Sequence, residues 1–372
     1  WQTSAWRGKR HHCHPDAAER LVDTLATSMS LTEQDLFYGE TIQSMIRWAR
    51  DLPTALRSYT CRPMEPRSLL LSANSERTVI FPRQYIRCIL ASAFFCLFET
   101  PRNRKFSCIN FDALYRSSEA PQEKAKLLAL LNYFRRVSRE RPSGVVSFRR
   151  LVMRSPPSII SNSSSFHREA SPVICDVEVV EEGSIIDQIE TTRVVFGCKY
   201  VGGGVLTGGS WQEESVYASN PEMIASCLIT EVLGDHESLF VSGAERFSKL
   251  KGYAFQMTYE SNFEDKILRE TDGTPASTFA IIDAKDFRPT GRLSQFLVAN
   301  MSRELCKAHI AFKGRPECAL STGNWGCGIH LGEPRLKCVL QVLAATLAGI
   351  KTVYYFSFGD PQLSEEMRAL CK

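Results

Sequence analysis

The residues with the clearest capacity for chemistry lie in one short segment, Tyr200–Glu214. Five glycines fall within eight positions there, and Gln212, Glu213 and Glu214 follow them. Glycines let backbone N–H groups approach an anion closely, and a helix that begins after them adds a favourable partial charge. The segment therefore predicts a loop that binds a phosphate or diphosphate beside a pair of carboxylates.

Two standard nucleotide-binding loops do not fit the glycine spacing. Gly203 and Gly208 match the outer glycines of a P-loop, but Gly209 stands where that motif needs lysine. A dinucleotide fingerprint could open at Gly202, but Thr207 occupies its third glycine position. The spacing therefore argues against a nucleoside triphosphate and against a nicotinamide cofactor.

The adjacent carboxylates Glu213 and Glu214 have two interpretations. Acidic residues in a first helical turn are stabilised by the helix dipole, which needs no function. Beside a diphosphate loop, repulsion between them favours protonation of one near neutral pH, as a general acid requires. Sequence neighbours do not readily flank a glycosidic bond at the roughly 5–9.5 Å of two-carboxylate mechanisms. We therefore expect one acid/base and one positioning carboxylate.

Two later segments could complete such a site. Thr322–Gly328 combines glycines with an amide side chain, which suits either a second anion-contacting loop or an ordinary turn. Tyr355–Asp360 predicts a strand whose aromatic end could pack on a base or a sugar. Phe356 and Phe358 would share one side of that strand, so at least one is expected in the core.

The elements that must position these segments fall into two regions. Apolar residues at helical spacing predict helices over residues 16–140, with prolines at their boundaries. A segment rich in serine and proline predicts a linker over residues 156–170. We therefore predict an N-terminal helical domain over residues 1–155 and a second domain over residues 171–372.

The second domain has the pattern of a three-layer α/β protein, because short β-branched runs alternate with helices. Strands are expected at Val173–Val180, Thr192–Phe196, Ser238–Ser242, Thr278–Ile282 and Thr352–Phe356. Helices are expected after Glu214, around Leu293–Ile310 and across Pro334–Ile350.

Composition limits the class of protein. Residues 1–160 hold 25 Lys and Arg against 14 Asp and Glu, whereas the rest of the chain holds 20 against 27. Thirteen cysteines without a Cys-x-x-Cys pair predict reduced, intracellular thiols. Four adjacent residues, His11 to His14, cannot easily converge on one tetrahedral ion, so this segment predicts a mobile terminus, with metal binding as a remote alternative. The longest uncharged apolar run, Cys88–Phe98, is too short to span a membrane.

Taken together, these motifs resemble one family, the eukaryotic-type poly(ADP-ribose) glycohydrolases, whose hallmark is Gly-Gly-Gly followed closely by Gln-Glu-Glu. Gly202–Gly204 and Gln212–Glu214 reproduce that hallmark. Further landmarks occur in the same order: Ala91–Cys96, Ile109–Phe111, Tyr133–Val137, Asn220–Glu222, Gly252–Ala254, Thr322–Gly328, Arg335–Lys337 and Phe356–Asp360. The resemblance implies a macrodomain, a three-layer α/β/α fold with a mixed sheet, preceded by a helical accessory domain.

The resemblance also implies an activity and its residues. The expected reaction is hydrolysis of ribose–ribose bonds, mainly from the chain end, which releases ADP-ribose without cofactor or metal. Glu214 would be the general acid/base, and Glu213 would hold ribose hydroxyls with support from Gln212. The diphosphate would be bound by Gly202, Gly203, Gly204, Asn324, Gly326, Cys327 and Gly328. Tyr253 would clasp the substrate, Phe358 would line the terminal ADP-ribose, and Ile185 and Asp187 would contact the adenine. Cys198 is also expected among the substrate-binding residues.

The same resemblance implies partners and a cellular setting. Poly(ADP-ribose) and poly(ADP-ribosyl)ated proteins would be the substrates, in the DNA damage response. A monomer in the nucleus and cytoplasm is expected, with no membrane partner.

The chain departs from the family pattern before the glycine run. The usual Asp-Phe-Ala-Asn is replaced by Val195-Phe-Gly-Cys198, which removes side-chain hydrogen bonds of about 0.5–1.5 kcal/mol each. His330 stands where an aromatic residue is common, and Leu331 replaces a glycine. An alternative is therefore a protein that binds poly(ADP-ribose) or ADP-ribose with weak or no hydrolysis. A third is a scaffold whose basic N-terminal region binds nucleic acid.

Overall fold

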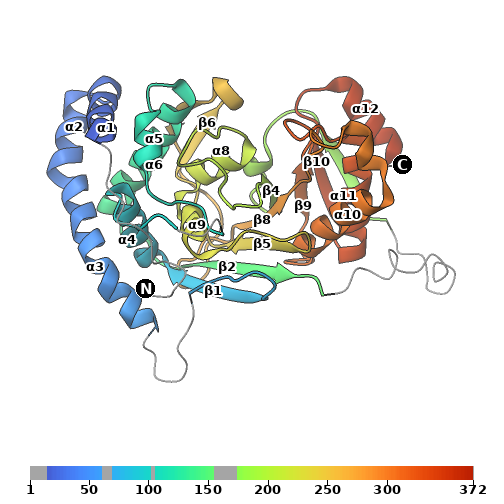
Figure 1. Ribbon diagram of the computed structural model, residues 1–372, viewed down its shortest axis with the longest axis horizontal. Coiled ribbons are helices and arrows are strands. Elements are labelled where there is room, and N and C mark those ends of the chain that lie inside the picture. Colours follow the sequence, from blue (N-terminus) through green and yellow to red (C-terminus); the bar gives the residue numbers. More distant parts are fainter. Residues whose placement is uncertain (1–14, 61–68, 102–104, 155–173, 372) are drawn as a thin grey trace.

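The computed structural model describes residues 15–60, 69–101, 105–154 and 174–371 (Figure 1). The predicted linker at 156–170 and the histidine-rich segment at 11–14 lie outside the described residues. Within the described ranges, no helix combines the length and the apolar character needed to cross a membrane.

An eight-stranded mixed sheet forms the centre of the molecule, in the order β1-β2-β5-β8-β4-β9-β10-β3. Strands β8, β4, β9, β10 and β3 run parallel, whereas β1, β2 and β5 pair antiparallel at one side. The strands are β1 (Arg77–Pro82), β2 (Val145–Val152), β3 (Asp176–Val180), β4 (Thr192–Gly197), β5 (Glu237–Ser242), β8 (Thr278–Asp283), β9 (Leu320–Gly323) and β10 (Thr352–Phe356). These bounds confirm all five predicted strands to within a few residues.

Helices cover both faces of the sheet and give the three layers expected (Figure 1). One face packs on α10 (Val298–Phe312), α11 (Pro334–Ala348) and α12 (Pro361–Leu370), whose apolar residues share a core with Val194 of β4. The other face packs on α4 (Arg83–Phe94), α6 (Pro121–Arg139), α8 (Gln212–Ser219) and α9 (Ala225–Ile229), in a core that includes Val195. Adjacent residues of β4 thus serve opposite cores, as the alternation of side chains along a strand requires.

The N-terminal helices extend the second of these cores. They are α1 (Pro15–Ser28), α2 (Leu31–Leu36), a π-helical turn η2 (Phe37–Thr41), α3 (Ile42–Thr60) and α5 (Asp112–Arg116). Leu25, Phe37 and Trp48 belong to the same buried cluster as Val195 and Phe279 of the sheet. The helical region and the sheet therefore share one continuous core.

Two strands correct the expectation of an entirely helical region before the linker. β1 lies within residues 16–140, and β2 lies a few residues before the linker, yet both join the sheet beside β5. The signal of β2 was hidden because Arg150 stands on its buried face, where its guanidinium donates to the carbonyls of Leu71, Glu231 and Val232. The predicted domain boundary at residues 156–170 stays a prediction. The sheet nevertheless contains strands that precede this segment in the sequence and strands that follow it.

Smaller elements carry the loops around the sheet. β6 (Ser248–Lys251) and β7 (Thr258–Asn262) form a separate two-stranded sheet, with the short helix η5 (Ala254–Gln256) between them. Three further short helices are η3 (Ile185–Asp187), η4 (Pro221–Ile224) and η6 (Arg292–Phe296). The helix predicted from Leu293 begins only at Val298, because η6 fills the preceding turn.

Candidate active site

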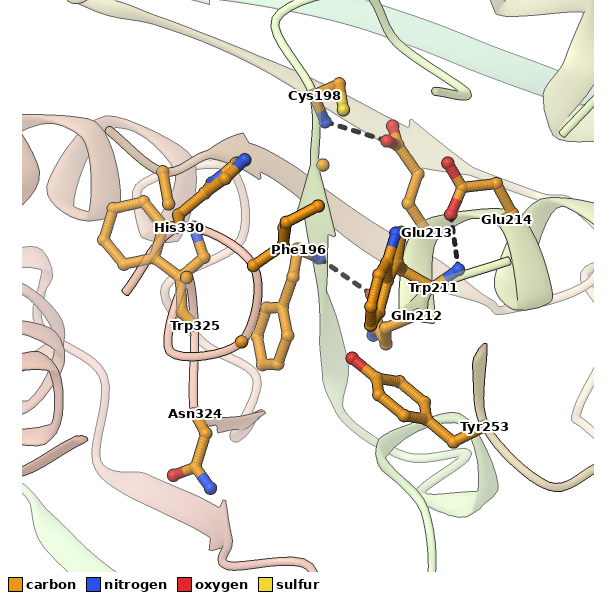
Figure 2. A pocket seen from close by; sticks show the side chains of 15 residues that line it. Phe196, Cys198, Trp211, Gln212, Glu213, Glu214, Tyr253, Asn324, Trp325 and His330 are labelled. Carbon is orange, nitrogen blue, oxygen red and sulfur yellow. Dashed lines mark hydrogen bonds between the residues drawn. The ribbon is translucent and has the colours of Figure 1, made fainter. Parts of the chain in front are cut away.

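A pocket opens where the parallel strands β4, β8 and β9 end (Figure 2). This edge is where ligands generally bind in parallel α/β sheets. The pocket is lined by Phe196, Gly197, Cys198, Trp211, Gln212, Glu213, Glu214, Tyr253, Ala284, Asn324, Trp325, Gly326, Gly328, Ile329 and His330. Eight of the residues predicted for the site are among them: Cys198, Gln212, Glu213, Glu214, Tyr253, Asn324, Gly326 and Gly328.

Backbone N–H groups hold both carboxylates of the pocket. The Glu213 carboxylate accepts from the N–H of Cys198 and of Gly202, each at 2.8 Å. The Glu214 carboxylate accepts from the N–H of Gly204 and of Trp211, also at 2.8 Å each. Each glutamate at the start of α8 is therefore fixed by two donors, one of them from the glycine run.

Close approach of these carboxylates explains the glycines. Gly203 has a positive φ of 49°, and a Cβ there would collide with the carboxylates of both Glu213 and Glu214. A Cβ on Gly209 would lie 2.6 Å from Oε1 of Glu214. Any larger residue at these two positions would push the carboxylates out of place.

The glycine run therefore acts differently from the simple anion cradle that its composition suggests. The N–H groups of Gly202 and Gly204 are taken by the glutamates, and that of Gly203 donates to the carbonyl of Tyr200 at 3.0 Å. The run orients the carboxylates, and its direct contact with a diphosphate stays a prediction.

The two carboxylates differ in their environment. Burial raises the pKa of Glu213 well above its usual value, and the neighbouring charge of Glu214 raises it further. The raised pKa thus belongs to Glu213, the carboxylate expected to position the ribose, whereas the sequence pattern linked a retained proton to the general acid. Glu214 acts in turn on Tyr253 across the pocket, where burial and then the Glu214 charge raise the pKa of the phenol.

Gln212 anchors α8 to the sheet. Its side-chain oxygen accepts from the N–H of Phe196 at 2.8 Å, and its amide nitrogen donates to the carbonyl of Val194 at 3.0 Å (Figure 2). The side chain thus makes the two hydrogen bonds that a neighbouring strand would otherwise make with the end of β4. These bonds fix the start of α8, the helix that carries both glutamates.

The loop after β9 forms the opposite wall of the pocket. Trp325 is fully buried and its indole N–H donates to the carbonyl of Ile282 at 3.3 Å. Nζ of Lys337 lies 4.0 Å from the centroid of the Trp325 ring. Among the described residues, no hydrogen-bond acceptor is found for the N–H groups of Gly326 and Gly328. These two groups are free to bind an anion, and the nearby Lys337 is itself paired with the Glu304 carboxylate.

Seven predicted site residues do not line the pocket: Gly202, Gly203 and Gly204, which lie behind the glutamates, and Ile185, Asp187, Cys327 and Phe358. Ile185 is buried, Asp187 pairs with Arg246 at 2.6 Å, and Cys327 is half-buried between the two pocket glycines Gly326 and Gly328. Phe358 is half exposed and lies beside Gly323 at the end of β9. Phe356, in contrast, is buried, which confirms that at least one aromatic residue of this pair belongs to the core.

The structure adds residues that sequence patterns did not single out. Trp211 packs edge-on against Tyr253, with ring centroids 5.6 Å apart, and Phe196 and Trp325 supply further aromatic surface. Ile329 completes the rim together with His330, which the sequence singled out only as a departure from the family pattern. The one available signal for Trp211 was its position directly before the Gln-Glu-Glu triplet.

The departures from the family pattern fall in different places. Val195 is fully buried in the core, on the face of β4 away from Phe196, and does not line the pocket. Cys198 does line it, and its backbone N–H holds Glu213 whatever its side chain. Within the described ranges, no group of three His, Cys, Asp or Glu is placed to hold a metal ion.

Comparison with known proteins identifies the family. The macrodomain model of the poly(ADP-ribose) glycohydrolases matches residues 164–365, and the model of their helical domain matches residues 29–150. The chain belongs to the poly(ADP-ribose) glycohydrolase family. The family's macrodomain fold and N-terminal helical region are those expected from the sequence.

The chain aligns with different fractions of individual poly(ADP-ribose) glycohydrolases. It is 28% identical to a probable poly(ADP-ribose) glycohydrolase 2 of Arabidopsis thaliana, over 89% of this chain and 74% of that protein. It is 30% identical to poly(ADP-ribose) glycohydrolase 1 of Caenorhabditis elegans, over 66% of this chain but only 32% of that protein. A poly(ADP-ribose) glycohydrolase structure from Thermomonospora curvata aligns with a TM-score of 0.39 and 16% identity, over 67% of this chain and 99% of that one.

Proposed function

We propose that this chain is a poly(ADP-ribose) glycohydrolase that releases ADP-ribose mainly from the chain end, with Glu214 as general acid/base. One observation carries the proposal: Glu213 and Glu214 line the same pocket, and two backbone N–H groups fix each of them. Fixed carboxylates at a pocket edge suit an oxocarbenium-like transition state, in which proton transfer to the leaving oxygen is the main demand.

The two glutamates have separate roles in this proposal. Glu214 protonates the leaving ribose oxygen and its carboxylate then takes a proton from the attacking water. Glu213 binds a ribose hydroxyl, and its raised pKa lets it donate a hydrogen bond when protonated. Tyr253, which lines the same pocket and packs edge-on against Trp211, would clasp the substrate beside Glu214.

The opposite wall would bind the diphosphate. The N–H groups of Gly326 and Gly328 are donors without an acceptor among the described residues. Trp211, Tyr253 and Phe196 offer flat aromatic surface for a sugar or base. Contacts of Ile185, Asp187 and Phe358 with ADP-ribose stay predictions, because these residues lie away from the pocket edge.

Digestion of purified poly(ADP-ribose) tests the proposal. Products of the parent, of Glu214→Gln and of Glu182→Gln are separated by chromatography; Glu182 is an exposed control. We expect ADP-ribose from the parent and the control, and a loss of at least about 10²-fold in Glu214→Gln. Mainly oligomeric products would contradict the end-directed mode, and full activity in Glu214→Gln would contradict the role of Glu214.

The same assay decides the alternative of binding without hydrolysis, which rests on Val195 and Cys198. Since Val195 lies in the core and Cys198 holds Glu213 through its backbone, neither departure removes a carboxylate from the pocket. No ADP-ribose release by the parent, with ADP-ribose binding retained in calorimetry, would favour the binding protein.

Two further properties belong to the proposal. We propose a monomer, which light scattering after size exclusion would test against a dimer mass. We also propose a nuclear and cytoplasmic location and action on poly(ADP-ribosyl)ated proteins, which imaging of the tagged full-length protein and digestion of modified proteins would test.

A further inference from the structure

Lys126 reaches from the helical region to the loop that holds Glu214. It lies on α6, and its Nζ donates to the carbonyls of Gly204 at 3.1 Å, Thr207 at 2.7 Å and Gly209 at 2.5 Å. The residue has no exposed surface. An ammonium group has three N–H donors, and each of them here has a backbone acceptor.

Burying a lysine ammonium here costs folding free energy, so its presence indicates that the ammonium has a role. Its partners are neutral carbonyls, and it takes part in none of the ion pairs found among the described residues. Burial lowers the pKa of Lys126 to about 8, against the opposing effects of the Glu123 and Glu214 charges. An apolar side chain would fill this space without the desolvation cost, so the donors themselves must matter.

The carbonyls that Lys126 binds belong to residues in contact with Glu214. Gly204 accepts from Lys126 with its carbonyl and donates its N–H to Oε1 of Glu214 at 2.8 Å. Gly209 accepts from the same ammonium and packs so closely that a Cβ would lie 2.6 Å from that oxygen. The ammonium and the carboxylate thus hold the glycine loop from opposite sides.

We propose that Lys126 is a positioning residue for Glu214, which acts by fixing the carbonyls of Gly204, Thr207 and Gly209. The kinetic part of this inference rests on the proposed function. It makes the helical region a contributor to the active site, because α6 supplies the side chain that sets the loop.

The proposal predicts a loss of activity at alkaline pH. A protonated Lys126 binds three carbonyls, whereas a neutral amine can donate only two hydrogen bonds. The charged groups that face it are Glu123 on α6 and Glu214 on α8, and both favour the protonated form. The hold on the loop should therefore weaken as the pH rises through about 8.

Lys126→Met tests the inference, with Lys124→Met as the matched control. Lys124 lies on the same helix and, within the described residues, its side chain makes no hydrogen bond or ion pair. Amide hydrogen exchange over residues 202–212 should be faster in Lys126→Met by about tenfold or more and unchanged in Lys124→Met. kcat should fall on the order of ten- to a hundredfold with little change in KM, and the alkaline loss of activity should disappear.

Each outcome of this test is informative. Unchanged exchange and unchanged kcat in Lys126→Met would overturn the proposal. If circular dichroism shows that this variant does not fold, Lys126→Arg is used in its place, because it keeps the positive charge. A fall in activity that begins at higher pH than in the parent supports the role of Lys126. A fall at the same pH overturns it. Because exchange needs no turnover, it tests the hold on the loop even where the parent proves not to hydrolyse poly(ADP-ribose).

Discussion

At the scale of single residues, the site depends on glycine more than on any charged partner of the glutamates. The carboxylates of Glu213 and Glu214 receive four backbone hydrogen bonds, and both pack against the Cα of Gly203. The geometry of the two carboxylates is therefore set by main chain that only glycine allows.

Gly203→Ala should reduce both stability and turnover. The added Cβ meets both carboxylates, and the positive φ of 49° disfavours alanine. We expect a loss of about 1–3 kcal/mol in the free energy of unfolding and a fall in kcat that exceeds the change in KM. Urea denaturation and steady-state kinetics measure the two. Gly39→Ala is the control, because nothing lies within 4 Å of a Cβ there; equal behaviour of the two variants would contradict the role of Gly203.

Glu213 should make the folded protein less stable as the pH rises above the ordinary carboxyl range. Its pKa is raised in the folded state, so between the ordinary and the raised value the native protein binds more protons than the unfolded chain, and stability falls with pH. Glu213→Gln should flatten the slope of Tm against pH above about pH 5, whatever its absolute Tm. Glu237 and Glu245 have lowered pKa values, so they change the pH dependence of stability only at lower pH than Glu213 does. An unchanged slope would show that Glu213 is not perturbed.

At the scale of elements, α8 is held by a side chain that bonds to the end of β4. Gln212→Ala would leave the N–H of Phe196 and the carbonyl of Val194 without partners. We expect a loss of about 1–3 kcal/mol in the free energy of unfolding, and a lower kcat because α8 carries both glutamates. Gln362→Ala on exposed α12 should change stability by less than about 0.5 kcal/mol. Equal urea midpoints for the two variants would contradict the anchoring role.

At the scale of the whole molecule, the helical region and the macrodomain depend on each other. β1 and β2 cover the side of β5, apolar residues of the N-terminal helices share a core with the sheet, and Lys126 donates to three carbonyls of the glycine loop. The basic excess of residues 1–160 is thus partly structural, since Arg150 is fully buried against Glu237.

A fragment of residues 171–372 should therefore not fold as an independent domain. It lacks β1 and β2, exposes the edge of β5 and uncovers apolar residues such as Val195 and Phe279. We expect aggregation during size exclusion, whereas the whole chain elutes as one species. A monomeric fragment with a cooperative thermal transition would contradict this.

The sequence predicted the strands with uninterrupted apolar character and the residues around the glutamates, because those signals are local. It did not predict β2, whose buried Arg150 finds its partners, three carbonyls and the Glu237 carboxylate, far away in the sequence. Nor did it predict the part played by Lys126, whose acceptors lie about 80 positions away. Composition also suggested that Gly202–Gly204 would offer free N–H groups. Only the fold shows that the glutamates occupy them.

The measurement that tests the central claim most directly is a crystal structure of Glu214→Gln with ADP-ribose. The account predicts that the ligand occupies the pocket, with its diphosphate at the N–H groups of Gly326 and Gly328. A ribose hydroxyl should lie about 3 Å from the side chain at position 213 or 214. ADP-ribose bound elsewhere, or bound with its ribose turned away from both positions, would contradict the assignment of this pocket as the active site.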